Sequence, residues 1–219
     1  MKVLITGATG MVGKGVLEQC LVREEITEIV SFTRRITGEK SSKLTEVVIE
    51  DFLNLAGHEE YLEGVDVVYY CLGAYTNKVG TKQFKQITVD YPKVFSVALA
   101  KYNPQVRFCL LSGVGVDRKE RSIFSFSRYK GEIENYLSSV HKEFYSIRPS
   151  YIYPVEVRKE PNFSDPYTRA LYPLIRCLGP KFSIPSDVLS MAMAEVGIIG
   201  AETEIIENSE LLTIGTMSK

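Results

Sequence analysis

The sequence is poor in the residues that build metal centres and disulfide scaffolds. Tryptophan is absent, histidine occurs twice, and the cysteines form no Cys-x-x-Cys pair: Cys20, Cys71, Cys109 and Cys177. Zinc sites and disulfide frameworks need closely spaced ligands or cysteines, so we expect no bound metal and a reducing environment. An excess of charge is lacking too, because 26 basic and 27 acidic residues leave a net charge of −1. Nucleic acid is therefore not an expected partner.

Long apolar runs are also missing. No stretch of about 18 apolar residues occurs, so no membrane span is expected. The opening MKVLITGATG reaches glycine before a signal-peptide core can develop, which favours the cytoplasm. The chain has 219 residues, of which 45% are hydrophobic and 24% charged. These values are typical of a globular protein, and we expect residues 1–219 to form a single domain.

Short runs of Val, Ile and Phe alternate with helical patterns, which indicates repeated strand–helix units. Strands are predicted at Lys2–Thr6, Glu28–Thr33, Glu46–Glu50, Val65–Cys71, Arg107–Ser112 and Glu143–Ile147. Helices are predicted at Met11–Arg23, Tyr91–Tyr102 and Tyr129–His141. Several strand runs are apolar at successive positions, as in strands that helices cover on both faces. The pattern predicts an α/β fold, a Rossmann-type doubly wound parallel sheet.

Proline gathers in one later segment. Five of the nine prolines fall there: Pro154, Pro161, Pro166, Pro173 and Pro180. Long regular elements do not persist through such a sequence. We expect a small irregular cap at about 154–182, over the carboxyl edge of the sheet where ligands bind in such folds. A further helix around Met191 should follow, capped by Ser186 or Asp187.

Three glycines follow the first predicted strand at a spacing of three, in TGATGMVG: Gly7, Gly10 and Gly13. The first permits a tight turn, the second lets the backbone approach a pyrophosphate, and the third lets the helix press on the strand. We predict that the pyrophosphate binds the backbone N–H groups at the helix start: Thr9, Gly10, Met11 and Val12. The alternative is a strand–helix turn with a purely structural role.

The end of the second predicted strand bears on the choice of nucleotide. In a dinucleotide fold, an acidic residue about 20 positions beyond the glycines binds the ribose hydroxyls of NAD. This sequence has Arg34 and Arg35 at that place, and guanidinium groups match the 2′-phosphate of NADP. NADP is therefore the expected cofactor, with NAD possible, and a solvated rim is the alternative for the arginines. Asp51 could accept a bond from the adenine amino group or cap its own loop.

Five motifs together resemble the short-chain dehydrogenase/reductase superfamily in its extended and atypical branches. They are TGATGMVG, DVVYYCLGA, RFCLLSGVGVD, RYKGEIE and YSIRPSYIY. The sequence is most similar to the Tat-interacting-protein-like group and more distantly to NmrA-like proteins. The resemblance implies a Rossmann-type fold that binds NADP(H), with the glycine turn on the pyrophosphate and Arg34 and Arg35 on the 2′-phosphate. It also implies that Leu72 and Gly73 line the cofactor.

In that superfamily a serine, a tyrosine and a lysine carry out the chemistry. Lys130 matches the lysine, which also holds the nicotinamide ribose, and Ser112 is the best match for the serine. The tyrosine position, four residues before Lys130, holds Phe126. Tyr129 lies about 100° away around a helix, so it should replace the phenol only if the helix begins late. Losing a general acid typically slows turnover about 10²- to 10⁴-fold.

The remaining histidines and thiols have structural interpretations. His58 should face solvent before the fourth strand, and His141 should end its helix with a positive charge that complements the dipole. Cys71 and Cys109 lie on predicted buried strands and should serve as small apolar residues.

These patterns leave three hypotheses. The first is an NADP-dependent oxidoreductase acting on a small carbonyl or alcohol, with Ser112 and Lys130 retained and Phe126 in place of the acid. The second is a catalytically weak regulator that senses NADP(H) and binds a protein partner. The third, a nucleotide-sugar epimerase or dehydratase, is weakened because the predicted cap is short. The expected partners are thus a nicotinamide dinucleotide and either an unknown small-molecule substrate or a protein.

Overall fold

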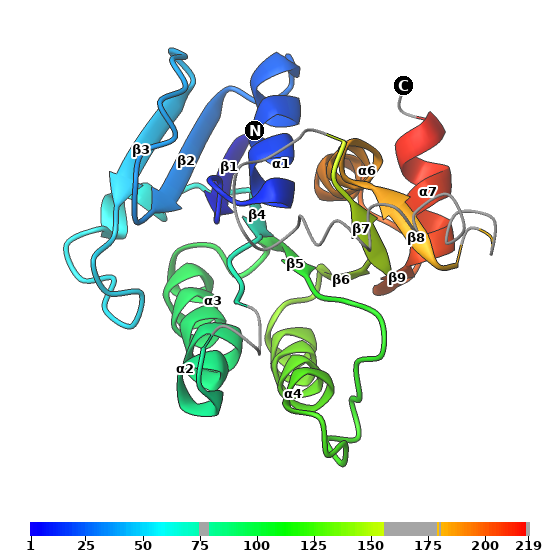
Figure 1. Ribbon diagram of the computed structural model, residues 1–219. Coiled ribbons are helices and arrows are strands. Elements are labelled where there is room, and N and C mark those ends of the chain that lie inside the picture. The colour runs from blue at the N-terminus through cyan, green and yellow to red at the C-terminus, as the bar shows by residue number, and fades with distance from the viewer. Residues whose placement is uncertain (75–78, 156–178, 180, 218–219) are drawn as a thin grey trace.

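The computed structural model describes residues 1–74, 79–155, 179 and 181–217. Its centre is a seven-stranded parallel sheet in the order β3-β2-β1-β4-β5-β6-β9 (Figure 1). The strands are β1 (Lys2–Thr6), β2 (Glu28–Thr33), β3 (Leu44–Val48), β4 (Val67–Tyr70), β5 (Arg107–Leu111), β6 (Phe144–Arg148) and β9 (Ile205–Glu207). Strand order reverses between β1 and β4, which is where a doubly wound sheet opens a crevice for ligands.

Helices cover both faces of the sheet. One face carries α1 (Met11–Val22), α6 (Ser186–Ile199) and α7 (Asn208–Met217) (Figure 1). The other carries α2 (Thr81–Lys85), η2 (Gln86–Asp90), α3 (Tyr91–Tyr102) and α4 (Ser125–Val140). Side chains of β1 alternate between two buried clusters, with Val3 and Ile5 in one and Leu4 in the other. The predicted doubly wound α/β fold is confirmed.

Several predicted boundaries moved. The predicted bounds of β1, β2 and α3 match, whereas β3 lies two residues earlier than predicted. The predicted start of α4 at Tyr129 is wrong, because the helix begins at Ser125 and includes the SFSR segment. The pattern missed the helical segments α2, η2 and α7, the strand β9, and the parallel pair β7 (Tyr151–Tyr153) and β8 (Ser183–Pro185); a short helix, η1 (Glu59–Tyr61), precedes β4. Three-residue elements are too short to show a period.

Most of the predicted cap, residues 156–178 and 180, lies outside the described residues. Beyond it, the prediction that Ser186 or Asp187 caps α6 is wrong. Pro185 is the N-cap, and no side-chain cap bond occurs there among the described residues. Ser186 is already helical, and its Oγ accepts a hydrogen bond from the backbone N–H of Val155 at 3.2 Å.

The C-terminal end of α4 corrects another expectation. His141 is its C-cap residue, but the side chain is only 3% exposed, and burial lowers its pKa to about 4. The ring is therefore neutral near pH 7, and a charge–dipole contact does not explain it. Instead, Nε2 lies 2.8 Å from Ser96 Oγ, and the ring centroid lies 5.1 Å from that of Phe108.

The thiols follow the structural interpretation. Cys109 is buried, and burial raises its pKa to about 12. Burial likewise raises the pKa of Cys71 above its usual value. Among residues 1–74, 79–155, 179 and 181–217, no group of three or more His, Cys, Asp or Glu could hold a metal ion. Over the same residues, no helix is long and apolar enough to cross a membrane.

Candidate functional site at the carboxyl edge of the sheet

The turn between β1 and α1 is shaped by the absence of side chains. Gly7 has φ = +74°, and a Cβ there would lie 2.8 Å from the carbonyl carbon of Cys71. Gly10 donates its N–H to the Gly7 carbonyl at 2.8 Å. A Cβ on Gly13 would lie 2.2 Å from that same oxygen. The turn thus needs glycine at 7 and 13 for close backbone approach, and it brings the start of α1 against β4.

The N-terminus of α1 can receive an anion. Gly10 is its N-cap, and within the described part of the chain no side chain caps it and no acidic residue lies in its first turn. Thr9 and Gly10 are exposed and Met11 is partly exposed, whereas Val12 packs into the core. The predicted pyrophosphate donor Gly10 already gives its N–H to Gly7, so the later N–H groups of the first turn and the positive end of the helix dipole are what favour a phosphate or carboxylate.

The end of β2 places two cations at the same edge of the sheet. The Thr33 hydroxyl is used locally, because it donates to the Arg35 carbonyl at 2.5 Å. Arg34 and Arg35 are exposed, and no described residue forms an ion pair with either of them. Asp51 caps its own loop, since its Oδ1 accepts the N–H of Leu53 at 2.9 Å. This geometry accounts for Asp51 without a ligand.

The segment after β4 lies across the crevice. The Leu72 N–H points to Thr6 Oγ1 at 3.4 Å, which ties the end of β4 to the end of β1. Gly73 is exposed, and nothing lies within 4 Å of a Cβ placed on it. Leu72 is therefore adjacent to the glycine turn, and whether Leu72 and Gly73 line a ligand stays a prediction; residues 75–78 beyond them are not described.

Lys130 lies on α4 and reaches back to β5. Its Nζ donates to the Leu111 carbonyl at 2.7 Å, and the residue is 9% exposed. Burial lowers its pKa to about 8, although the nearby Glu134 carboxylate acts in the opposite direction. Because α4 begins at Ser125, Phe126 and Lys130 lie one turn apart on one helix face. The late helix start that would let Tyr129 serve instead does not occur.

Aromatic side chains occupy the positions around the missing phenol. The Tyr129 ring packs 6.2 Å from the Phe84 ring, with the Arg128 guanidinium 5.1 Å from its centroid. The Phe126 ring lies over Gly113, where a Cβ would meet its Cζ at 2.8 Å. Tyr129 therefore behaves as a packed aromatic, and Phe126 fills the space that a side chain at position 113 would need.

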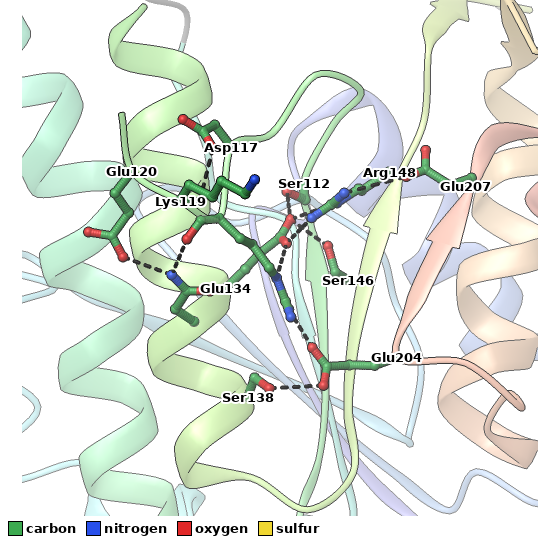
Figure 2. A network of polar contacts seen from close by, with 12 residues as sticks. Ser112, Asp117, Lys119, Glu120, Glu134, Ser138, Ser146, Arg148, Glu204 and Glu207 are labelled. Atoms are coloured by element: carbon green, nitrogen blue, oxygen red, sulfur yellow. Dashed lines mark hydrogen bonds and ion pairs between the residues drawn. The ribbon is translucent and has the colours of Figure 1, made fainter. Parts of the chain in front are cut away.

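Sequence reasoning missed the strongest electrostatic feature of this edge. Glu134, one turn beyond Lys130, is fully buried and accepts hydrogen bonds from two serines and two arginines (Figure 2). The donors are Ser112, Ser146, Arg118 and Arg148. Burial alone would raise the Glu134 pKa, but the bonds from Arg148 and the serines outweigh it and lower the pKa. The i+4 spacing from Lys130 was the available signal, because it places a carboxylate on the buried face.

The network extends to the last strand of the sheet. Arg118 also pairs with Glu204, whose other oxygen accepts the Ser138 hydroxyl at 2.9 Å. Arg148 Nη1 lies 3.4 Å from Glu207 on β9. These contacts fasten α4, the loop after β5, and β9 to one another (Figure 2).

Comparisons with known proteins agree with this geometry. A family described as NAD(P)H-binding matches residues 7–158. Protein HTATIP2 of Rattus norvegicus is 33% identical over 135 residues, which are 60% of this chain and 54% of that protein. The match thus spans about half the length of that curated relative.

Two solved structures share the fold at low sequence identity. Gre2 of Candida albicans in complex with NADPH has a TM-score of 0.71 at 14% identity, covering 95% of this chain and 78% of its own. The UDP-glucose 4-epimerase of Thermus thermophilus in complex with NAD has a TM-score of 0.68 at 16% identity, covering 99% and 83%. At such identities the likeness shows the fold alone.

Proposed function

Because the chain belongs to the NAD(P)H-binding family, we propose that it binds NADP(H) between β1 and β4 and acts as an oxidoreductase on a small carbonyl or alcohol. The observation that carries the proposal is the β1–α1 turn. There, Gly13 packs closely on Gly7, and no side chain caps the start of α1 among the described residues. Such a helix start suits a pyrophosphate.

The residues present fit NADP(H). The residues that would hold the pyrophosphate are Thr9, Met11 and Val12, on the turn that Gly7, Gly10 and Gly13 shape, with Leu72 and Gly73 beside them. Arg34 and Arg35 would pair with the 2′-phosphate, which favours NADP(H) over NAD(H). When bound, the nicotinamide supplies hydride chemistry, while the protein binds and orients it.

The chain's own chemistry at the reacting end is sparse. Lys130 would hold the nicotinamide ribose with its buried ammonium, and Ser112 lies at the end of β5 beside it. Phe126 supplies no proton, so the usual acid is missing. We therefore expect turnover about 10²- to 10⁴-fold below that of an enzyme with the acid in place.

A second candidate is a regulator that senses NADP(H) and turns over little. The packing of the Phe126 ring against Gly113 favours it, because an apolar ring fills the place where the superfamily keeps its acid. In this interpretation the bound dinucleotide changes the affinity of the protein for a partner. The dinucleotide itself is consumed slowly or not at all.

Calorimetric titration with NADPH and NADH tests the cofactor assignment. NADPH should bind more tightly, and Arg34→Ala should weaken NADPH binding about tenfold or more while leaving NADH unchanged. Lys101→Ala, which removes an exposed cation near the end of α3, is the matched control and should change neither. Equal affinities of the unaltered protein for both dinucleotides would contradict the role of the arginines.

Consumption of NADPH across a panel of small aldehydes and ketones separates the two candidates. An oxidoreductase should show slow turnover that Phe126→Tyr increases, because the phenol restores a proton donor. If both proteins bind NADPH and neither consumes it, the sensor is the better description.

A further inference from the structure

The Glu134 carboxylate is surrounded by donors on both oxygens. Oε1 accepts Ser112 Oγ at 2.6 Å, Ser146 Oγ at 2.6 Å and Arg148 Nε at 3.1 Å. Oε2 accepts Arg118 Nε at 3.0 Å and the Arg148 Nη2 group. An arginine cannot accept a hydrogen bond, so two guanidinium groups hold this carboxylate in its ionised, acceptor-only form. Both serines must therefore be the donors.

Ser112 therefore donates its only hydroxyl proton to Glu134. A serine hydroxyl has one proton and two lone pairs, so Ser112 Oγ keeps only acceptor capacity toward anything else. Its bond to Glu134 is short and charge-assisted, which makes it among the stronger hydrogen bonds of a protein. A ligand carbonyl that required the Ser112 proton would have to break that bond inside a buried network.

Two neighbouring groups do not replace the lost donor. Phe126 has no hydroxyl, and its ring lies against Gly113 beside Ser112. Lys130 Nζ donates one of its three protons to the Leu111 carbonyl at 2.7 Å, and in the proposed function the nicotinamide ribose takes the others. The oxygen that Ser112 presents at the end of β5 thus suits a partner that brings its own proton.

We propose that Glu134 is a positioning residue that holds the Ser112 proton, so that Ser112 Oγ accepts a hydrogen bond from a hydroxyl-bearing ligand and does not donate one to a carbonyl. The part concerning the ligand rests on the proposed function. Within the carbonyl and alcohol pair of that function, it predicts that the alcohol binds more tightly than the carbonyl. The part concerning the proton stands on the network alone.

Ser146 provides a matched control for the proton. It donates to the same Oε1 at the same distance, but it lies on β6 and is fully buried. In the unligated protein, Ser112→Ala and Ser146→Ala should each lower Tm by roughly 2–8 °C, and Ser112→Thr should recover most of the loss because it keeps the hydroxyl. An unchanged Tm for Ser112→Ala beside a lowered one for Ser146→Ala would overturn the assignment.

The preference for an alcohol is tested by a measurement that a purely structural role of Ser112 would not change. Dissociation constants of cyclohexanol and cyclohexanone should be measured on the NADP⁺-saturated protein. Cyclohexanol should bind about tenfold more tightly, Ser112→Ala should abolish that difference, and Ser146→Ala should keep it. Cyclohexanone binding as well as cyclohexanol, or no measurable binding of either, overturns the preference for an alcohol. Failure of NADP⁺ itself to bind would instead refute the proposed function, and the Tm comparison would still decide the Ser112 proton.

Discussion

The two halves of the sheet's carboxyl edge are lined by different kinds of chemical group. Around β1 and α1 the chain uses backbone, with Gly7 and Gly13 in contact and no acidic side chain in the first turn of α1 among the described residues. Around β5, β6 and α4 it uses buried charge, with Glu134 held between Arg118 and Arg148. In the first half the start of α1 has no side-chain cap among the described residues, whereas in the second the buried carboxylate has donors on both oxygens.

We call the glycine turn with the start of α1 the proposed binding surface. We call the buried network of Glu134 the frame; its other members are Ser112, Ser146, Arg118 and Arg148. A helix N-terminus with free N–H groups gains its missing partners when an anion arrives. A buried carboxylate with several donors is already saturated, and it gives rigidity to the elements that supply them. Removing one member of the frame should therefore lower stability, whereas a change in the glycine turn should also abolish dinucleotide binding.

Glu134→Ala should have the largest effect, because it leaves two guanidinium groups without their buried anion. We expect the free energy of unfolding to fall by about 3–5 kcal/mol, measured by urea denaturation at pH 7. The control is Glu132→Ala on the same helix, whose carboxylate pairs with Lys93 at the partly exposed surface and should contribute at most about 1 kcal/mol. Similar losses for the two variants would remove the distinction between frame and surface.

Gly13→Ala tests the other half. Its new Cβ would lie 2.2 Å from a backbone oxygen, which no side-chain motion relieves, so the turn itself must move. We expect a stability loss of about 3 kcal/mol and no calorimetric binding of NADPH. Gly80→Ala, where nothing lies within 4 Å of the new Cβ, should leave NADPH binding unchanged and lower stability by at most about 1 kcal/mol, because Gly80 is the N-cap of α2. Full NADPH affinity in Gly13→Ala would show that the turn does not hold the dinucleotide.

The same contrast explains what the sequence could reveal. The glycine turn was predictable because its signal is local: a strand, three glycines at fixed spacing, and a helix. The match of the NAD(P)H-binding family over residues 7–158 confirms the nucleotide-binding family, and the similarity to HTATIP2 agrees with the resemblance that those motifs indicated. The roles of the individual site residues stay predictions.

The frame was not predictable, because its members come from separate elements that only the register of the sheet brings together. Ser112 follows β5, Ser146 lies within β6 and Glu134 lies on α4, so no spacing in the sequence joins them. The start of α4 was missed for a related reason. The segment from Ser125 to Arg128 lacks an apolar period of its own and is helical because α4 packs on the sheet.

The smallest expected effect lies at the far end of α4 and depends on pH. His141 has a folded-state pKa of about 4 against 6.5 when unfolded, because burial disfavours its charged form. Between these values the unfolded chain binds the proton and the folded one does not, so stability falls as the pH is lowered through this window. From pH 6.5 to pH 5 the loss should be about 2 kcal/mol, measured by urea denaturation.

His141→Gln should flatten the pH dependence over that window. The glycine turn holds no titratable side chain. Dinucleotide binding at the turn should therefore not follow the pH dependence that His141 gives to stability. Glu134 would act only below about pH 4.5, where the unfolded chain takes up its proton while the lowered pKa keeps the folded carboxylate ionised. If the free energy of unfolding of His141→Gln still falls between pH 6.5 and pH 5, a group other than His141 is responsible.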